Sequence, residues 1–152
     1  HMVIVDADEV VGTCGCGHRG CLEQVASATG IVNLTEKKLA ECSQASVLRE
    51  ISPLTAKDVL DAAKAGDALA EQAAENMMKH LGRAAAYIAC VVNPDIFVIG
   101  GGVSKAGEYL IEGISRYYKD YAFHASADTK FALASLGNDA GMIGAAGMVC
   151  AL

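Results

Sequence analysis

The sequence predicts an α/β fold in which helices pack on a sheet. In several long stretches apolar residues recur at steps of three and four, which is typical of amphipathic helices. These stretches alternate with short runs that are continuously apolar, as in buried strands. Hydrophobic residues make up 53% of the 152 residues and charged residues 20%, so the chain is globular and about one domain long.

The N-terminal third contains one expected strand and two expected helices. We expect a short strand over residues 2–5 and a loop over residues 6–20, where glycines and charges break any period. From Leu22 the apolar spacing becomes helical, and Gly30 is expected to end this helix. Thr35 is expected to cap a further short helix, after which the pattern is weak.

The rest of the chain alternates helices with strands. Thr55 and Asp58 have the spacing of a capping box, which predicts a helix that ends at Gly66. An alanine-rich helix is expected to begin at Asp67 and to end before Pro94, because proline cannot continue it. The remaining expected elements are a strand in the glycine-ended run 95–102, a helix over 109–121, a strand over 130–136 and a helix over 141–152.

The charge of the chain argues against two classes of partner. The formal net charge is -6 and the pI is about 5.1, whereas nucleic acids and anionic membranes attract surfaces rich in lysine and arginine. No stretch offers the roughly 18 uncharged apolar residues of a membrane span, and no secretory signal is recognisable. We therefore expect neither nucleic acid nor a membrane as partner, and a cytoplasmic location in which thiols stay reduced.

Three of the six cysteines lie close together in the segment CGCGHRGCLE. The intervening glycines permit the sharp turn that would let Cys14, Cys16 and Cys21 reach one metal ion, and this glycine-rich setting is unlike a core. We predict a zinc site with three thiolate ligands. From the residues alone, its fourth ligand is a histidine, with His18 and His1 as candidates, or water. A redox-active cysteine pair is the alternative.

Glu23 follows the last of these cysteines and has two interpretations. It would lie in the first turn of the helix that begins at Leu22, where the helix dipole favours a carboxylate. Alternatively, a structural zinc fixes the start of this helix, and Glu23 accepts hydrogen bonds from a polyhydroxylated ligand. The three other cysteines lie in apolar helical patterns and are interpreted as core residues: Cys42, Cys90 and Cys150.

The segment CGCGHRGCLEQVASATGIV closely resembles the signature of the ROK family of repressors, open reading frames and sugar kinases, and within it the bacterial glucokinases. The resemblance continues at NPDIFVIGGGVS and LGNDAGMIGAA, so it covers nearly the whole chain. It implies an actin-like ATPase fold, that is, a ribonuclease H-like α/β lobe with helices on a mixed sheet. Residues 1–152 would then be a fragment of the C-terminal domain, without the N-terminal lobe and the start of the C-terminal lobe.

The resemblance also assigns roles to the residues of the cluster. The implied ligands of a structural zinc are His1, Cys14, Cys16 and Cys21. Glu23 would form hydrogen bonds with sugar hydroxyls, and His1 would contact the sugar as well. His1 is accordingly interpreted as a native residue rather than as a cloning remnant.

The glycines of VIGGGVSKAG form neither of two common nucleotide motifs. Lys105 stands where the third glycine of a dinucleotide fingerprint belongs, and no Gly-Lys-Ser/Thr of a P-loop follows. On the residues alone, the segment is either a tight strand-to-helix turn or a strand end on whose backbone a flat ring can lie. The resemblance implies the second, an adenosine-binding segment, with contacts at Gly101, Gly102, Val103 and Ser104.

The activity implied by the resemblance is transfer of the γ-phosphate of ATP, bound with Mg²⁺, to the 6-hydroxyl of glucose. We name no catalytic residue, because the family's catalytic aspartate is expected upstream, and Asn138-Asp139 belongs to another motif. Expected partners are glucose or a related hexose, ATP or ADP, and a second copy in a homodimer. The alternatives are a sugar-responsive repressor of the same family and a kinase for another hexose or an N-acetylhexosamine. A zinc ribbon is disfavoured, because Cys42 and His80 lack its spacing.

Overall fold

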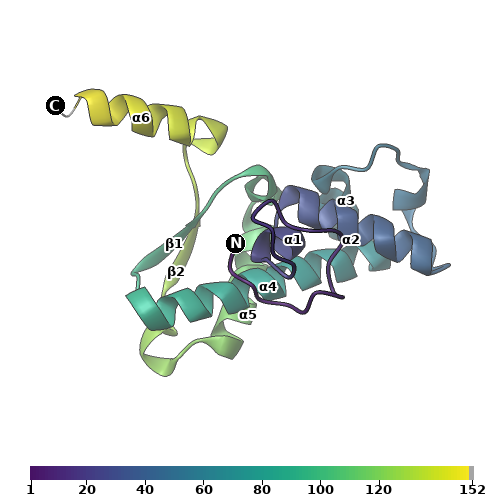
Figure 1. Cartoon of the computed structure of the whole chain (residues 1–152), viewed down its shortest axis with the longest axis horizontal. Coiled ribbons are helices and arrows are strands. Elements are labelled where there is room, and N and C mark those ends of the chain that lie inside the picture. Colours follow the sequence, from purple (N-terminus) through teal and green to yellow (C-terminus); the bar gives the residue numbers. More distant parts are fainter. Residues whose placement is uncertain (151–152) are drawn as a thin grey trace.

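The structure is a computed structural model that describes residues 1–150 (Figure 1). Its helices are α1 (Leu22–Ala26), α2 (Ala28–Glu41), α3 (Ala56–Lys64), α4 (Ala68–Val92), α5 (Glu108–Tyr121) and α6 (Ala140–Cys150). Its strands are β1 (Ile96–Ile99) and β2 (Lys130–Leu133), and its short 3-10 helices are η1 (Val47–Glu50), η2 (Gly102–Ala106), η3 (His124–Ser126) and η4 (Gly137–Asp139). The predicted α/β class is confirmed.

The sheet of the described residues consists of β1 and β2, which pair in parallel. Helix α5 connects them, as parallel strands require a crossover. One face of the sheet packs on α4 and α5 through three aromatic rings, with Phe97 and Phe131 stacked at 5.2 Å and Tyr118 edge-on to Phe131 at 5.1 Å. On the other face, Ile96 and Val98 are exposed.

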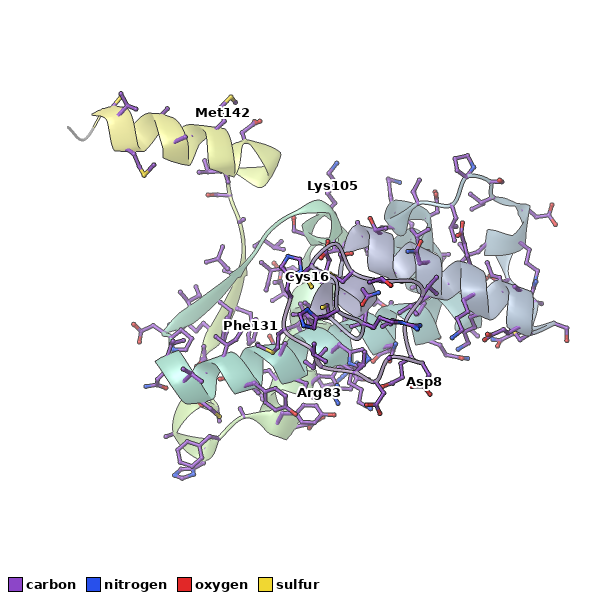
Figure 2. The ribbon with its side chains drawn as sticks, in the orientation of Figure 1. Asp8, Cys16, Arg83, Lys105, Phe131 and Met142 are labelled. Atoms are coloured by element: carbon purple, nitrogen blue, oxygen red, sulfur yellow. The ribbon has the colours of Figure 1, made fainter. Side chains whose placement is uncertain are left out.

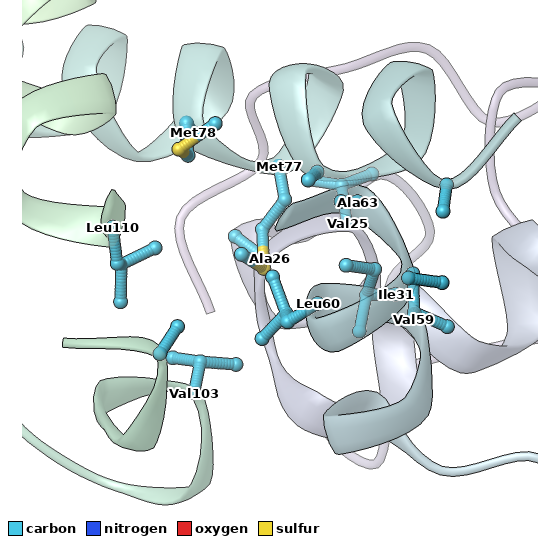
Figure 3. Packing of buried hydrophobic residues seen from close by; sticks show 14 of the residues in the cluster. Val25, Ala26, Ile31, Val59, Leu60, Ala63, Met77, Met78, Val103 and Leu110 are labelled. Carbon is cyan, nitrogen blue, oxygen red and sulfur yellow. The ribbon is translucent and has the colours of Figure 1, made fainter. Parts of the chain in front are cut away.

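The main core lies where α1, α2, α3 and α4 meet (Figure 3). Leu60 of α3 and Met77 of α4 are among its buried side chains, and Val103 from η2 and Leu110 from α5 extend it. Helices α4 and α5 cross closely at Gly82, where a Cβ atom would lie 2.7 Å from the backbone nitrogen of Tyr118. This core therefore connects the N-terminal helices to the segment that follows β1.

The boundaries of α3 and α4 that were predicted from capping residues and Pro94 agree with the structure. Thr55 and Asp58 form the reciprocal hydrogen bonds of a capping box at the start of α3. Asp67 caps α4 by accepting hydrogen bonds from the backbone of its first turn. Asn93 ends α4 with a positive φ of 43°, directly before Pro94. Local capping chemistry was sufficient to place these helix ends.

Three predictions for the first 41 residues are wrong. Residues 2–5 do not form a strand, because only Val3 pairs, in an isolated antiparallel bridge with Cys21. Gly30 does not end a helix: α1 stops at Ala26, and α2 runs through Gly30 to Glu41. Thr35 is not a cap, since it is buried inside α2 and its hydroxyl donates to the Ile31 carbonyl.

Helix α6 extends away from the rest of the molecule (Figures 1 and 2). It is built from small and apolar residues, and its large side chains Met142, Met148 and Val149 are 69%, 72% and 73% exposed. Cys150 on this helix and Cys90 on α4 are exposed, so their assignment to the core is wrong, whereas Cys42 is partly buried. Among residues 1–150, no helix is both long and apolar enough to span a membrane.

Candidate functional site

The N-terminal segment lies over α1 and α4 and is held there by backbone hydrogen bonds (Figure 2). The amide of Leu22 donates to the Met2 carbonyl at 2.7 Å, and the amide of Ile4 donates to the Gly20 carbonyl at 2.9 Å. Arg83 of α4 donates to the carbonyl of Ile4. Gly20 has a positive φ of 84°, a conformation that glycine adopts without strain. These contacts bring residue 1 next to residue 21.

The four predicted metal ligands lie together. One donor atom from each of His1, Cys14, Cys16 and Cys21 lies within 4.8 Å of the others. The closest pairs are His1 Nδ1 with Cys14 Sγ at 3.3 Å and Cys16 Sγ with Cys21 Sγ at 3.6 Å. His18 is outside this group, with its Nδ1 at 3.6 Å from Cys16 Sγ. Of the two histidines considered from the sequence, the structure therefore groups His1 with the thiols.

The spacing and chemistry of these donors fit zinc. Tetrahedral zinc with bonds of about 2.3 Å to sulfur sets two thiolate sulfurs about 3.8 Å apart, close to the 3.6 Å between Cys16 and Cys21. A disulfide would require about 2.0 Å, and all the described cysteines are free thiols. Three sulfurs and one imidazole are also the ligand set of a closed structural zinc site rather than of a calcium or magnesium site.

The three thiols differ in acidity because their surroundings differ. A hydrogen bond from the backbone of His18, with a second from its ring, lowers the pKa of Cys16 to about 6. Burial raises the pKa of Cys21 to about 11, and the neighbouring thiols contribute to the rise. For Cys14, a backbone hydrogen bond from Cys16 lowers the pKa, but burial and the Glu23 carboxylate outweigh it, and the net shift is upward. A cation among the three would favour their deprotonated forms.

Glu23 lies beside the cluster, in the first turn of α1. Its carboxylate Oε2 accepts a hydrogen bond from the Cys14 thiol at 3.3 Å and lies 3.4 Å from His1 Nδ1. The side chains of Glu23 and His1 are nevertheless 56% and 63% exposed. The two residues proposed to contact a sugar are therefore neighbours, and both are open to solvent.

A small cavity of about 170 Å³ lies next to Glu23 and was not predicted from the sequence. Ser27, Thr29 and Asn33 line it from α2 and its cap, opposite the loop that carries Cys14. Thr29 and Asn33 are four residues apart, so they lie on the same face of a helix. That spacing of two polar residues beside the cysteine motif is the signal that would have identified this face.

The glycine segment after β1 forms a turn in which Gly101 is exposed and Val103 is buried. Gly101 has a positive φ of 81°, and a Cβ built on it would meet no atom within 4 Å. Ser104 donates from its hydroxyl to the Gly101 carbonyl at 2.7 Å, which closes the turn. Val103 is 7% exposed and belongs to the core, and Gly102 packs against Ala28 at the start of α2.

The fold is that of the ROK sugar kinases, an actin-like ATPase fold. A crystal structure of a ROK family glucokinase from Streptomyces griseus, in complex with glucose and AMPPNP, matches with a TM-score of 0.81 and 27% identity. The match covers 97% of this chain and 49% of that one.

The sequence matches the ROK family over residues 1–151, and the chain belongs to this family. A glucokinase from Halalkalibacterium halodurans is 44% identical over 140 residues, which are 90% of this chain and 42% of that protein. The DNA-binding transcriptional repressor Mlc of Escherichia coli is 36% identical over 112 residues, or 74% of this chain and 27% of the repressor. The chain thus spans less than half the length of these curated relatives.

Proposed function

We propose that this chain is part of the C-terminal domain of an ATP-dependent glucokinase, which transfers the γ-phosphate of ATP to the 6-hydroxyl of glucose. The observation that carries the proposal is the placement of the Glu23 carboxylate beside a four-donor metal cluster, at 3.3 Å from Cys14. The similarity to glucokinases supports the substrate class. The catalytic base belongs to the part of the protein that precedes this chain.

In this proposal the zinc is structural. His1, Cys14, Cys16 and Cys21 would hold it, and bound zinc would supply a cross-link and a positive charge rather than reaction chemistry. The cross-link keeps the N-terminal segment against the first turn of α1. Glu23 then stays in place to accept hydrogen bonds from sugar hydroxyls, and the exposed imidazole of His1 contacts the same sugar.

The glycine turn is proposed to bind the adenosine of ATP, which enters with Mg²⁺. The open space above Gly101 allows a flat ring to lie on the backbone of residues 101–104. The hydrogen bond from Ser104 to Gly101 keeps the turn closed, and the buried Val103 side chain anchors it to the core. Gly102 contacts the first residue of α2, so the proposed nucleotide segment lies against the helix that follows Glu23.

The exposed apolar surface supports the proposal that the chain is one portion of a larger protein. Val91 at the end of α4 is 83% exposed, and Val98 on the outer face of β1 is 59% exposed. These side chains and those of α6 are exposed apolar groups of the kind that a further part of a protein covers. We further propose that the protein forms a homodimer and is located in the cytoplasm.

The test is a coupled assay of the intact protein with glucose, other hexoses and N-acetylhexosamines, each with ATP and Mg²⁺. We expect glucose to give the highest kcat/KM. A higher kcat/KM for another sugar would transfer the proposal to that sugar. The similarity to the Mlc repressor makes a sugar-responsive regulator the second candidate. Sequence-specific DNA binding that glucose modulates, without phosphoryl transfer to any sugar, would favour the regulator and overturn the kinase.

A further inference from the structure

We infer that Gln24 is a positioning residue that fastens the two ends of the metal-binding loop to α1, an inference that rests on the proposed zinc site. Gln24 is not among the four candidate ligands, and its side chain is directed to the backbone on both sides of the cysteine segment. It lies in α1 directly after Glu23. Helix α1 therefore carries both Glu23, the proposed sugar-binding residue, and Gln24, which holds the metal-binding loop.

The side-chain amide of Gln24 uses both of its ends. Its Oε1 accepts hydrogen bonds from the amides of Gly20 at 3.0 Å and Cys21 at 3.3 Å. Its Nε2 donates to the carbonyls of Val11 and Gly12, both at 3.2 Å. Glutamine offers an acceptor and two donor hydrogens on one planar group, which this arrangement requires. Glutamate retains the acceptors but loses the donors, and methionine has a similar length with neither.

These four bonds define the loop that holds the metal ligands. The segment between the two attachments carries Cys14 and Cys16, and Cys21 is itself one of the attachment points. Because the attachments are made by protein groups alone, they set the spacing of the thiols before a metal binds. Groups that orient metal ligands without touching the metal typically change metal affinity by about 10-fold to 100-fold when they are removed.

Tryptic cleavage within this loop can measure whether Gln24 holds the loop against α1. Arg19 is exposed, and the amide of the next residue, Gly20, is one of the two that donate to Gln24 Oε1. Trypsin cleaves the Arg19–Gly20 peptide bond only when this backbone can adopt an extended conformation in the protease. In chelated protein, the cleavage rate therefore reports whether Gln24 holds the loop, separately from zinc binding and from catalysis.

The experiment compares the intact wild-type protein with Gln24→Met and Gln24→Glu. Gln72→Met on α4 is the matched control, because Gln72 is an exposed helical glutamine whose side chain accepts from Lys38. We measure zinc release to a chromophoric chelator, tryptic cleavage after Arg19 with and without prior chelation, and thermal unfolding. We expect Gln24→Met to release zinc about 10-fold to 100-fold faster, Gln24→Glu also to release it faster than wild type, and Gln72→Met to match wild type. Cleavage after Arg19 should follow the same pattern in the chelated proteins.

A zinc-release rate and an Arg19 cleavage rate in Gln24→Met equal to those of wild type would overturn the inference. An equally faster release in Gln72→Met would do the same. If Gln24→Met does not fold, the result for Gln24→Glu is used instead, because this variant keeps the acceptor for Gly20 and Cys21 and replaces the donors to Val11 and Gly12 with a charged oxygen. If the wild type contains no zinc, the proposed metal site fails, but cleavage after Arg19 still tests the fastening role of Gln24: faster cleavage in Gln24→Met supports it, and equal cleavage overturns it.

Discussion

Glu23 is exposed to solvent, yet its carboxylate has defined neighbours in the Cys14 thiol and the His1 imidazole. A carboxylate that only favours a helix start needs no such neighbours. Thiolates at this distance would repel Glu23, whereas a cation among them would attract it. The orientation of Glu23 and the occupancy of the proposed zinc site are therefore coupled through electrostatics.

The Glu23→Gln substitution separates the two interpretations of this residue. If Glu23 accepts hydrogen bonds from sugar hydroxyls, losing its charge costs about 1.5–3 kcal/mol of binding, which is roughly a 10-fold to 100-fold higher KM for glucose. Zinc content should not change, because Glu23 is outside the ligand group. Glu71→Gln is the control, since Glu71 is also an acidic residue in a first helical turn. An unchanged KM in the Glu23 variant would leave it as a helix-start charge.

Metal content is the second prediction at the residue scale. Elemental analysis of the purified protein should find about one zinc per copy of this chain. A thiol titration should find three of the six cysteines unreactive until a strong chelator is added, namely Cys14, Cys16 and Cys21. Cys90 is exposed and should react at once. Metal-free protein in which all thiols react equally would contradict the site.

At the scale of the element, Asp67 joins two helices. Besides capping α4, its carboxylate accepts from the Ser46 hydroxyl at 3.0 Å and the Val47 amide at 2.8 Å, which attaches η1. Burial raises the pKa of Asp67, but the hydrogen bonds from Ala70, Val47, Ser46 and Leu69 together outweigh it, and the net pKa is lowered. A lowered folded-state pKa means that the charged carboxylate stabilises the fold above the unfolded pKa, and that this stabilisation is lost as the pH falls through the folded-state pKa.

Asp67→Ala should therefore destabilise the protein in a pH-dependent way. We expect a loss of about 0.5–2 kcal/mol at neutral pH, the usual cost of removing an N-cap. The difference from wild type should shrink well below the ordinary aspartate pKa of 3.8, where the wild-type carboxylate becomes protonated. Urea unfolding followed by circular dichroism measures both. The exposed Asp120 provides the control, because Asp120→Ala should have little effect at either pH. A loss that does not vary with pH would contradict the role of the charge.

Gly30 sets the position of α1 relative to α2. A Cβ atom at Gly30 would lie 2.6 Å from the carbonyl oxygens of Glu23 and Gln24, which belong to helix backbone and cannot move aside alone. Gly30→Ala should cost about 1–3 kcal/mol of stability and raise the KM for glucose, because α1 must shift. Gly144→Ala in α6 is the matched control, since nothing lies near its Cβ position. Equal stability of the two variants would show that α1 tolerates the displacement.

At the scale of the whole molecule, α6 and the outer face of β1 are exposed, and the proposed kinase activity is expected to need more than this chain. We expect the isolated chain to phosphorylate no glucose with ATP and Mg²⁺, and the intact protein to be active, because the catalytic base and the phosphate-binding loop are expected upstream. The same coupled assay on both proteins provides the measurement. Turnover by the isolated chain would mean that its own residues supply the catalytic base.

The sequence predicted those parts of the molecule that are determined locally. The caps at Thr55 and Asp67 and the stop at Pro94 place helix ends through groups within a few residues. The four candidate metal ligands lie together in the structure; residue type and spacing pointed to the three cysteines, and the family resemblance pointed to His1. Gly30 was wrongly predicted to end a helix. A glycine is needed there because α1 and α2 approach each other closely, which no local sequence pattern reveals. Gln24 lies within the cysteine signature, but its role was not predicted, since its four partners are backbone groups.

The candidate metal site is complete within the first 24 residues of the chain, whereas the sheet must pair Ile96 with Lys130. On a ribosome, the four ligands and Gln24 leave the exit tunnel well before β1 has been synthesised. We therefore expect the proposed zinc to be able to bind before the sheet forms, and α4 to dock afterwards, where Arg83 donates to the carbonyl of Ile4.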